Sequence, residues 1–231
     1  MTDDKLHKIR HSLAHVMAAA VQEIYPNARF GIGPVIENGF YYDFDFPSDN
    51  EKSIQITPEI LPEIEKKMRA IIKKGLPVEQ LFFPIAHAIK EAKVAGQIYK
   101  MELLEEIKSG KRSGQPSFYR IGSFTDLCKG PHVTNTKDLP LDGFKLTRLA
   151  GAYWKGDSAN PQMQRIYAVA FETKKELEEH LRLLEEAEKR DHRKLGVELD
   201  LFTFSDLVGP GLPLWTPKGT LLRNLLDDFV W

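Results

Sequence analysis

The stretch FGIGPVIENGFYYDFDF, residues 30–46, carries the clearest structural signal in this sequence. Asn38-Gly39 is typical of a type I′ turn, and β-rich runs flank it on both sides. After the turn, four aromatic residues alternate with Tyr41 and two aspartates; they are Phe40, Tyr42, Phe44 and Phe46. Alternation with a period of two predicts a strand with one buried face. The sequence therefore predicts a hairpin whose aromatic face packs against a second layer.

A long helix is expected before this hairpin, from about residue 2 to residue 25. Its apolar residues recur at helical spacing and form one stripe, made of Leu6, Ile9, Leu13, Val16, Ala20 and Ile24. At about 100° per residue, His7, His11 and His15 fall on nearly the opposite side. We therefore expect the histidines on the polar face of this helix.

The rest of the chain mixes helices and strands. Strand-like runs occupy residues 118–124, 144–149 and 164–171. Further helices are expected over residues 57–75, 85–95, 174–194 and 221–231. The order predicts the α+β class, with an antiparallel sheet packed against helices in two layers. The charge-rich helix at 174–194 has a thin apolar stripe and is typical of a linker between domains.

Composition excludes several classes of protein. The chain has 231 residues, one cysteine and a net charge of −1. A single cysteine excludes an internal disulfide framework and favours a reducing compartment. No apolar run approaches the roughly 18 residues that span a bilayer. Glycine patterns of phosphate-binding loops and of serine hydrolases, G-x-x-x-x-G-K-[ST] and G-x-S-x-G, are missing.

Charge is unevenly distributed along the chain. Residues 108–155 contain nine Lys and Arg against three Asp, a net charge of +6. The segment also holds Tyr119, Tyr153 and Trp154. Basic groups interleaved with aromatic rings suit the end of a single-stranded RNA. The alternative is a solvated basic surface with the aromatic rings in the core.

Two short motifs could converge on one site. His11-x-x-x-His15 places two imidazoles one turn apart on a helix, and Cys128-x-x-x-His132 lies in a loop after a strand. Three nitrogens and one sulfur form the ligand set of a tetrahedral zinc site. The same groups without metal could position a water and move protons. The competing interpretation is solvated histidines and a small buried cysteine.

Five blocks of sequence resemble the editing domain of bacterial threonyl-tRNA synthetases: HSLAH (11–15), FGIGPVIENGFYYDF (30–44), FTDLCKGPHV (124–133), LAGAYWKGDS (149–158) and QRIYAVAF (164–171). RDHRKLG (190–196), ELDLF (198–202) and the final PLWTPKGTLLRNLLDDFVW resemble the passage into that family's class II catalytic core. The resemblance implies an editing domain over residues 1–171, a linker helix over 172–192 and a truncated core start over 193–231.

The resemblance implies that the chain hydrolyses seryl ester from threonine tRNA, with the tRNA 3′ end as its partner. It assigns the hydrolytic site to His11, His15, Cys128, His132, Asp126 and Lys100. Tyr42 matches a position in the substrate pocket, and we expect Lys129, Tyr153 and Trp154 of the basic segment to contact substrate as well. Either His11 or His132 would move protons, and Lys100 would stabilise the oxyanion.

Cofactors and location follow from the same resemblance. We favour editing without metal, with zinc on His11, His15, Cys128 and His132 as the alternative. ATP and Mg²⁺ belong to the full-length ligase, which forms a homodimer and works in the cytoplasm, away from membranes. Class II motifs 2 and 3 are missing, so ligation is not expected of this chain. Two other interpretations stay open: a free-standing alanyl-type trans-editing deacylase, and a non-catalytic tRNA-binding module with structural zinc.

Overall fold

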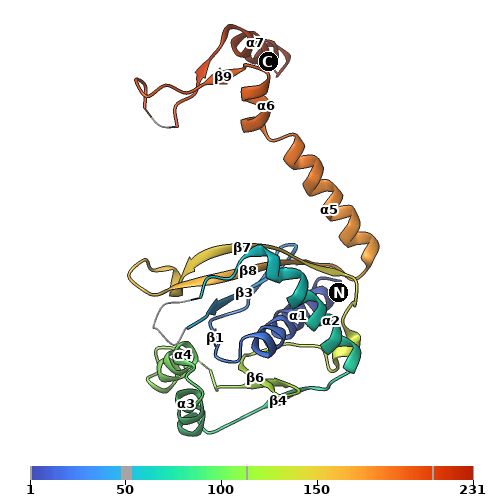
Figure 1. Cartoon of the computed structure of the whole chain (residues 1–231), viewed down its shortest axis with the longest axis vertical. Coiled ribbons are helices and arrows are strands. Elements are labelled where there is room, and N and C mark those ends of the chain that lie inside the picture. The colour runs from blue at the N-terminus through green and yellow to red at the C-terminus, as the bar shows by residue number, and fades with distance from the viewer. Residues whose placement is uncertain (1, 48–53, 113, 210, 231) are drawn as a thin grey trace. The chain divides into compact units, whose positions relative to one another are not determined.

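The structure is a computed structural model that describes residues 2–47, 54–112, 114–209 and 211–230. It divides into two compact units, Met1–Leu177 and Glu178–Trp231. Both units combine helices with antiparallel strands (Figure 1), which confirms the predicted α+β class.

The main sheet of the first unit runs in the order β1-β3-β8-β7, with β2 paired to β3. All of its pairings are antiparallel. The strands are β1 (Arg29–Phe30), β2 (Val35–Ile36), β3 (Gly39–Asp45), β7 (Phe144–Tyr153) and β8 (Gln162–Ala170). The aromatic face of β3 is buried as predicted, because Phe40, Tyr42 and Phe44 are at most 1% exposed. This face forms the centre of the core.

The hairpin turn lies one residue earlier than predicted. Ile36 pairs with Gly39, so Glu37 and Asn38 form the turn and Gly39 already belongs to β3. Neither Asn38 nor Gly39 has a positive φ, so the predicted type I′ turn is wrong. Gly39 is required for another reason: a Cβ there would lie 1.9 Å from the carbonyl oxygen of Ala168 on β8.

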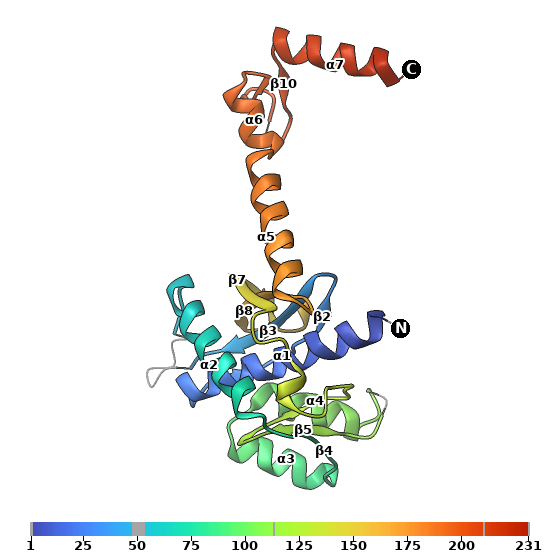
Figure 2. The ribbon, with the colours of Figure 1, turned by 90° about the vertical axis from the view of Figure 1, so that its right-hand side faces the viewer.

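A second, smaller sheet turns the expected two layers into three. It consists of β4 (Val78–Leu81), β5 (Phe118–Ile121) and β6 (Phe124–Leu127), accompanied by α3 (Ile85–Val94) and α4 (Ile98–Lys108). The predicted strand over 118–124 is thus a hairpin, and α4 was not predicted. Between the two sheets lie α1 (Thr2–Ile24) and α2 (Leu61–Lys74), as Figures 1 and 2 show.

Neighbouring elements consequently bury helix α1 on other sides as well as along its apolar stripe. Ser12 and Ala18 are fully buried, and His15 is only 2% exposed. The expectation that the histidines, opposite the apolar stripe, are not buried in the core is therefore wrong for His15. The small sheet, which comes from a distant part of the sequence, covers that side of the helix.

The single helix predicted over residues 174–194 is two helices in the structure. Helix α5 spans Lys174–Lys189, and α6 (His192–Glu198) starts anew because the Asp191 side chain accepts a hydrogen bond from Arg193 N as an N-cap. Strands β9 (Phe202–Thr203) and β10 (Leu214–Trp215) pair, and α7 spans Pro217–Val230.

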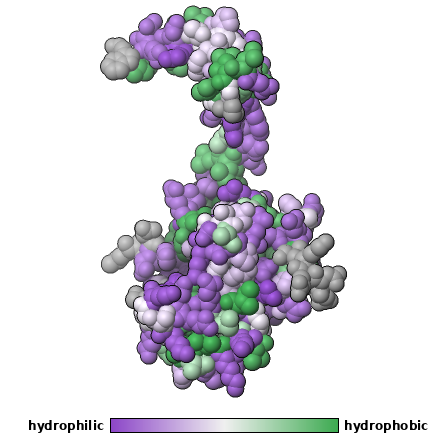
Figure 3. Space-filling view, turned by 90° about the vertical axis from the view of Figure 1, so that its left-hand side faces the viewer, coloured by the Kyte–Doolittle hydropathy of each residue, from purple (hydrophilic) through white to green (hydrophobic). Residues whose placement is uncertain are grey.

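Apolar side chains remain exposed on this second unit, visible as green atoms in Figure 3. The most exposed are Leu207, Phe229, Val230 and Val197. Large exposed apolar surfaces are typical of interaction sites. None of the helices in the described part of the chain is long and apolar enough to span a membrane.

The close approach at Gly39 gives the first prediction. Gly39→Ala should lower the free energy of unfolding by about 2–3 kcal/mol, because backbone atoms of β8 must move to admit the methyl group. Chemical denaturation followed by circular dichroism measures this loss. Gly151→Ala on β7 is the matched control, since its Cβ would meet only the flexible end of Gln162. Equal stabilities of the two variants would contradict the close approach of Gly39 to the β8 backbone.

Candidate functional site

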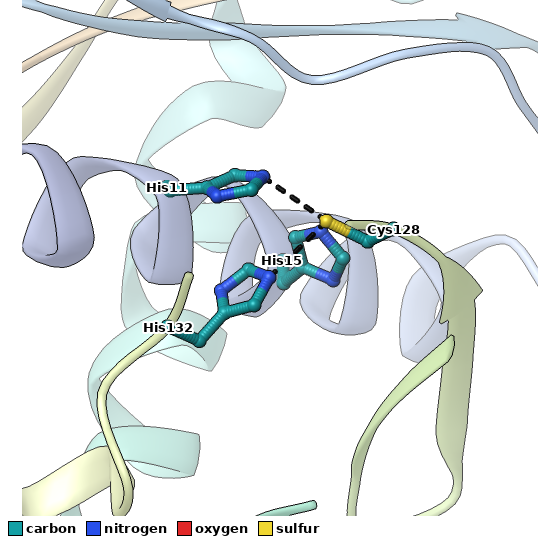
Figure 4. A group of neighbouring side chains, drawn as sticks. All are labelled: His11, His15, Cys128 and His132. Atoms are coloured by element: carbon teal, nitrogen blue, oxygen red, sulfur yellow. Dashed lines mark hydrogen bonds between the residues drawn. The ribbon is translucent and has the colours of Figure 1, made fainter. Parts of the chain in front are cut away.

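The two histidine-containing motifs converge as the sequence predicts. His11 and His15 lie one turn apart on α1, and Cys128 and His132 come from the loop after β6 (Figure 4). Cys128 Sγ lies 3.2 Å from His11 Nε2 and 3.3 Å from His132 Nε2. One donor atom from each of the four residues lies within 4.8 Å of the others. The cluster therefore joins segments more than a hundred residues apart.

Backbone contacts fix the loop that carries Cys128. The main chain of Cys128 donates to Ser117 O, and Ser117 Oγ donates back to Cys128 O at 2.7 Å. Gly130 has a φ of +74°, and its amide donates to Cys128 Sγ at 3.3 Å. A Cβ at Gly130 would lie 2.3 Å from the Tyr119 hydroxyl, so only glycine fits. The sulfur is thus held in place by the main chain around it.

Ring contacts orient the histidines. The His11 and His132 rings stack with centroids 4.1 Å apart, and the edge of His15 meets His132 at 4.4 Å. His11 Nδ1 lies 3.1 Å from Pro131 O, and His132 Nδ1 lies 3.1 Å from Ser12 Oγ. Each of these two rings is therefore anchored through one nitrogen and presents the other to Cys128.

Burial makes the cluster electrically neutral. Desolvation lowers the pKa of His11, of His15 and of His132 below the usual value for an imidazole. It also raises the pKa of Cys128 to about 11. At neutral pH the site therefore contains three neutral imidazoles and a thiol. The donor set fits zinc, whose binding would release the thiol proton.

A buried ion pair borders the cluster. Lys100 Nζ lies 2.5 Å from Asp126 Oδ1 and donates to the Tyr42 hydroxyl at 3.2 Å, while Tyr42 donates to the other oxygen of Asp126. Burial next to Asp126 holds the pKa of Tyr42 well above its usual range. His15 Nε2 lies 3.9 Å from Asp126 Oδ2 and links the pair to the histidines. Removing Lys100 would leave a buried carboxylate unpaired, which typically costs about 3–5 kcal/mol.

The two groups open onto one cavity of about 310 Å³. His11, His15 and Cys128 of the cluster line it, and so do Lys100 and Asp126 of the ion pair. Arg112 and Lys129 add positive charge to its wall. His132 and Tyr42 are not among its lining residues, and so they lie behind the groups that would meet a substrate.

Tyr153 and Trp154 lie outside this cavity. Trp154 is 3% exposed, packs with Tyr99 in a separate apolar cluster and donates its indole N–H to Glu102. A base cannot stack on a ring packed in this way, so the structure corrects the expected substrate contact of Trp154. Tyr153 is 44% exposed, but it does not reach the histidines' cavity. The interleaved sequence pattern did not distinguish core from surface.

Two groups that anchor the histidine rings were not predicted from the sequence. Ser12 and the carbonyl of Pro131 hold the histidine rings, but no spacing rule marks them. Ser12 stands within the His11–His15 motif, which was its only signal. A main-chain carbonyl leaves no signal in a sequence.

Comparison with known proteins relates this chain to the threonine–tRNA ligases. Residues 117–167 match the family described as the second additional domain of threonyl and alanyl tRNA synthetases. The threonine–tRNA ligase of Gloeobacter violaceus is 52% identical over 227 residues, which cover 98% of this chain and 35% of that protein. The chain is homologous to the threonine–tRNA ligases. The resemblance predicted from the sequence blocks is thereby confirmed.

Two further threonine–tRNA ligases are similar to this chain over nearly its whole length. The enzyme of Citrifermentans bemidjiense is 50% identical over 98% of this chain and 34% of its own length, and that of Clostridium tetani is 48% identical over 96% and 33%. The chain thus spans about a third of these ligases. In this chain, the residues that match the family model, 117–167, include Asp126, Cys128 and His132.

The raised pKa of Cys128 gives the second prediction. At pH 8 the folded chain should react with iodoacetamide roughly 100-fold more slowly than the urea-unfolded chain, whose thiol has a pKa of about 8.5. The rate should rise about tenfold per pH unit between pH 7 and 9, as the thiolate fraction grows. Cys128 is the only cysteine, so mass spectrometry reports on it alone. Equal rates in the folded and unfolded chain would show that the thiol is neither buried nor protonated as described.

Proposed function

We propose that this chain carries the proofreading activity of a threonyl-tRNA synthetase: it hydrolyses the ester of serine mistakenly attached to threonine tRNA. The observation that carries the proposal is the cavity shared by the neutral His–Cys cluster and the Lys100–Asp126 pair. The site offers a proton acceptor, His11, and a positively charged group, Lys100, to the same cavity of about 310 Å³. Homology to threonine–tRNA ligases supplies the substrate class.

Chemistry explains why such an activity is needed. Serine lacks one methyl group of threonine but keeps the hydroxyl, and a methylene-sized difference discriminates by only about 1–3 kcal/mol. Valine is easier to exclude because it leaves a hydroxyl-binding group unpaired. A synthetase for threonine therefore needs a second site that admits serine and rejects the larger threonine.

His11 is the base that we favour. It lines the cavity, and because a carbonyl can only accept, the contact with Pro131 O places its proton on Nδ1 and leaves Nε2 unprotonated. A water replacing the thiol at Nε2 would give up a proton there while its oxygen attacks the ester carbonyl. His11 would then return the proton to the departing ribose oxygen. His132 does not line the cavity and supports the cluster from behind.

Lys100 is placed to stabilise the oxyanion. An ammonium group has three N–H donors, and Asp126 and Tyr42 accept two of them. The third is then available to the tetrahedral intermediate in the cavity. Asp126 and Tyr42 accordingly hold Lys100, and His15 orients the water or the terminal ribose. Arg112 and Lys129 would attract the phosphates of the tRNA 3′ end.

Zinc is the alternative aid to the same reaction. His11, His15, Cys128 and His132 would hold it, and zinc would supply Lewis-acid chemistry to the site. We propose that editing proceeds without it.

The remaining assignments concern the whole protein. We propose that residues 1–171 are the editing domain, 172–192 the linker and 193–231 the start of a class II core. Ligation of threonine with ATP and Mg²⁺, homodimer formation and a place in the cytoplasm would be properties of a full-length ligase, and this chain spans about a third of the length of its relatives.

The third prediction concerns turnover. In single-turnover assays with excess protein, the chain should release serine from seryl-tRNA for threonine and leave threonyl-tRNA intact. His11→Ala should slow release by at least about 100-fold, since general base catalysis contributes about 10²–10⁴-fold. His87→Ala, which removes an exposed histidine of α3 outside this cavity, should not change the rate.

Other results would favour other functions. Release of serine from alanine tRNA alone would indicate an alanyl-type trans-editing deacylase. No release from any aminoacyl-tRNA by the folded wild-type chain would overturn the enzymatic proposal and leave an RNA-binding module.

The fourth prediction separates the two uses of the cluster. Treatment with a chelator should change neither the circular dichroism spectrum nor serine release, because the proposed base and oxyanion donor are side chains. Elemental analysis before and after treatment verifies the metal content. Loss of folding would indicate structural zinc, and loss of turnover alone would indicate catalytic zinc.

A further inference from the structure

Ser12 contacts the His–Cys cluster from inside helix α1. It is fully buried, its Oγ lies 3.1 Å from His132 Nδ1, and it accepts a 3.0 Å hydrogen bond from Val133 N. Serine is a mediocre residue for a helix interior, and a buried hydroxyl is costly without partners. Its partners here are His132, a member of the cluster, and the next residue of the same loop, Val133. Both contacts point to a role in the site rather than in packing.

The direction of each hydrogen bond in the cluster can be deduced, starting at His11. Pro131 O can only accept, so His11 Nδ1 carries a proton and the neutral ring has a lone pair on Nε2. That lone pair faces Cys128 Sγ at 3.2 Å. The single thiol proton must therefore point to His11, because otherwise two lone pairs would face each other.

The deduction continues from Cys128 to His132. With its proton committed to His11, Sγ can only accept from His132 Nε2 at 3.3 Å. His132 then carries its proton on Nε2, and its Nδ1 is an acceptor. Ser12 Oγ is the partner of that nitrogen and must donate to it. Oγ still has lone pairs for the amide of Val133, so every contact has one donor and one acceptor.

The result does not depend on where the thiol proton resides. If it moves to His11, the resulting thiolate accepts from His11 and His132 alike. His132 again needs a proton on Nε2, and Ser12 again donates to Nδ1.

We propose that Ser12 is a positioning residue that donates its hydroxyl proton to His132 Nδ1 and thereby stabilises the Nε2–H tautomer that the contact with Cys128 requires. In this state His132 directs the thiol proton of Cys128 towards His11. The tautomer follows from the hydrogen-bond geometry alone, whereas its effect on serine release rests on the proposed function.

The same hydroxyl can serve a metal-bound cluster. A histidine that ligates zinc through Nε2 must carry its remaining proton on Nδ1. His132 would then donate to Ser12 Oγ, which accepts as well as it donates. Ser12 would thus support both tautomers of His132, whereas an alanine would support neither.

The fifth prediction tests this role by NMR. Long-range ¹H–¹⁵N spectra of the metal-free chain, with ¹⁵N-labelled histidine and His132 assigned through His132→Gln, show which ring nitrogen is protonated. We expect Nε2–H in the wild-type chain, a mixture of tautomers in Ser12→Ala and the wild-type pattern in Ser12→Thr. In zinc titrations of the same samples, Ser12→Ala should bind about 10–100-fold more weakly.

Ser117→Ala is the matched control. It removes another buried hydroxyl that holds the same loop, but this hydroxyl contacts Cys128 O and no histidine, so the tautomer should be unchanged. An Nδ1–H tautomer in the wild-type chain, or a wild-type pattern in Ser12→Ala, would overturn the proposal. The wild-type spectrum decides even if Ser12→Ala does not fold. Because the spectra need no tRNA, failure of this proposal is distinguishable from failure of the editing function.

Discussion

The enclosure of helix α1 between two sheets is the constraint on which this site depends. A helix covered on one side only could leave His11 and His15 in water, where each would titrate near its ordinary pKa. Here the small sheet covers them, and desolvation keeps the imidazoles neutral. The same enclosure brings the loop after β6 against α1, which places Cys128 and His132 within contact distance. Burial and convergence have one cause.

Neutrality of the cluster contrasts with the ion pair beside it. Lys100 and Asp126 form an ion pair in a buried setting, where each compensates the other and Tyr42 bonds to both. In the proposed reaction, an attacking water would meet an uncharged proton acceptor, His11, and the ammonium group of Lys100 in the same cavity. A positive group that is already in position stabilises the negative charge that develops on the substrate.

Local signals in the sequence predicted what depends on local periodicity. The alternation over Phe40–Phe46 gave the buried face of β3, and the two motifs containing His11 and Cys128 indicated the site. What failed depended on distant segments. The role of Gly39 is set by Ala168, and the burial of His15 by strands from residues 78–127. Trp154 sits among basic residues in the sequence but packs on Tyr99 in space.

The two anchored histidines differ in their vulnerability to genetic change. Pro131 presents a main-chain oxygen to His11, and no codon substitution at position 131 can delete a carbonyl. Ser12 presents a side chain to His132, so a single base change can remove that anchor. A substitution at residue 12 can therefore remove the anchor of His132 directly, whereas a substitution at residue 131 can affect the anchor of His11 only by moving the main chain.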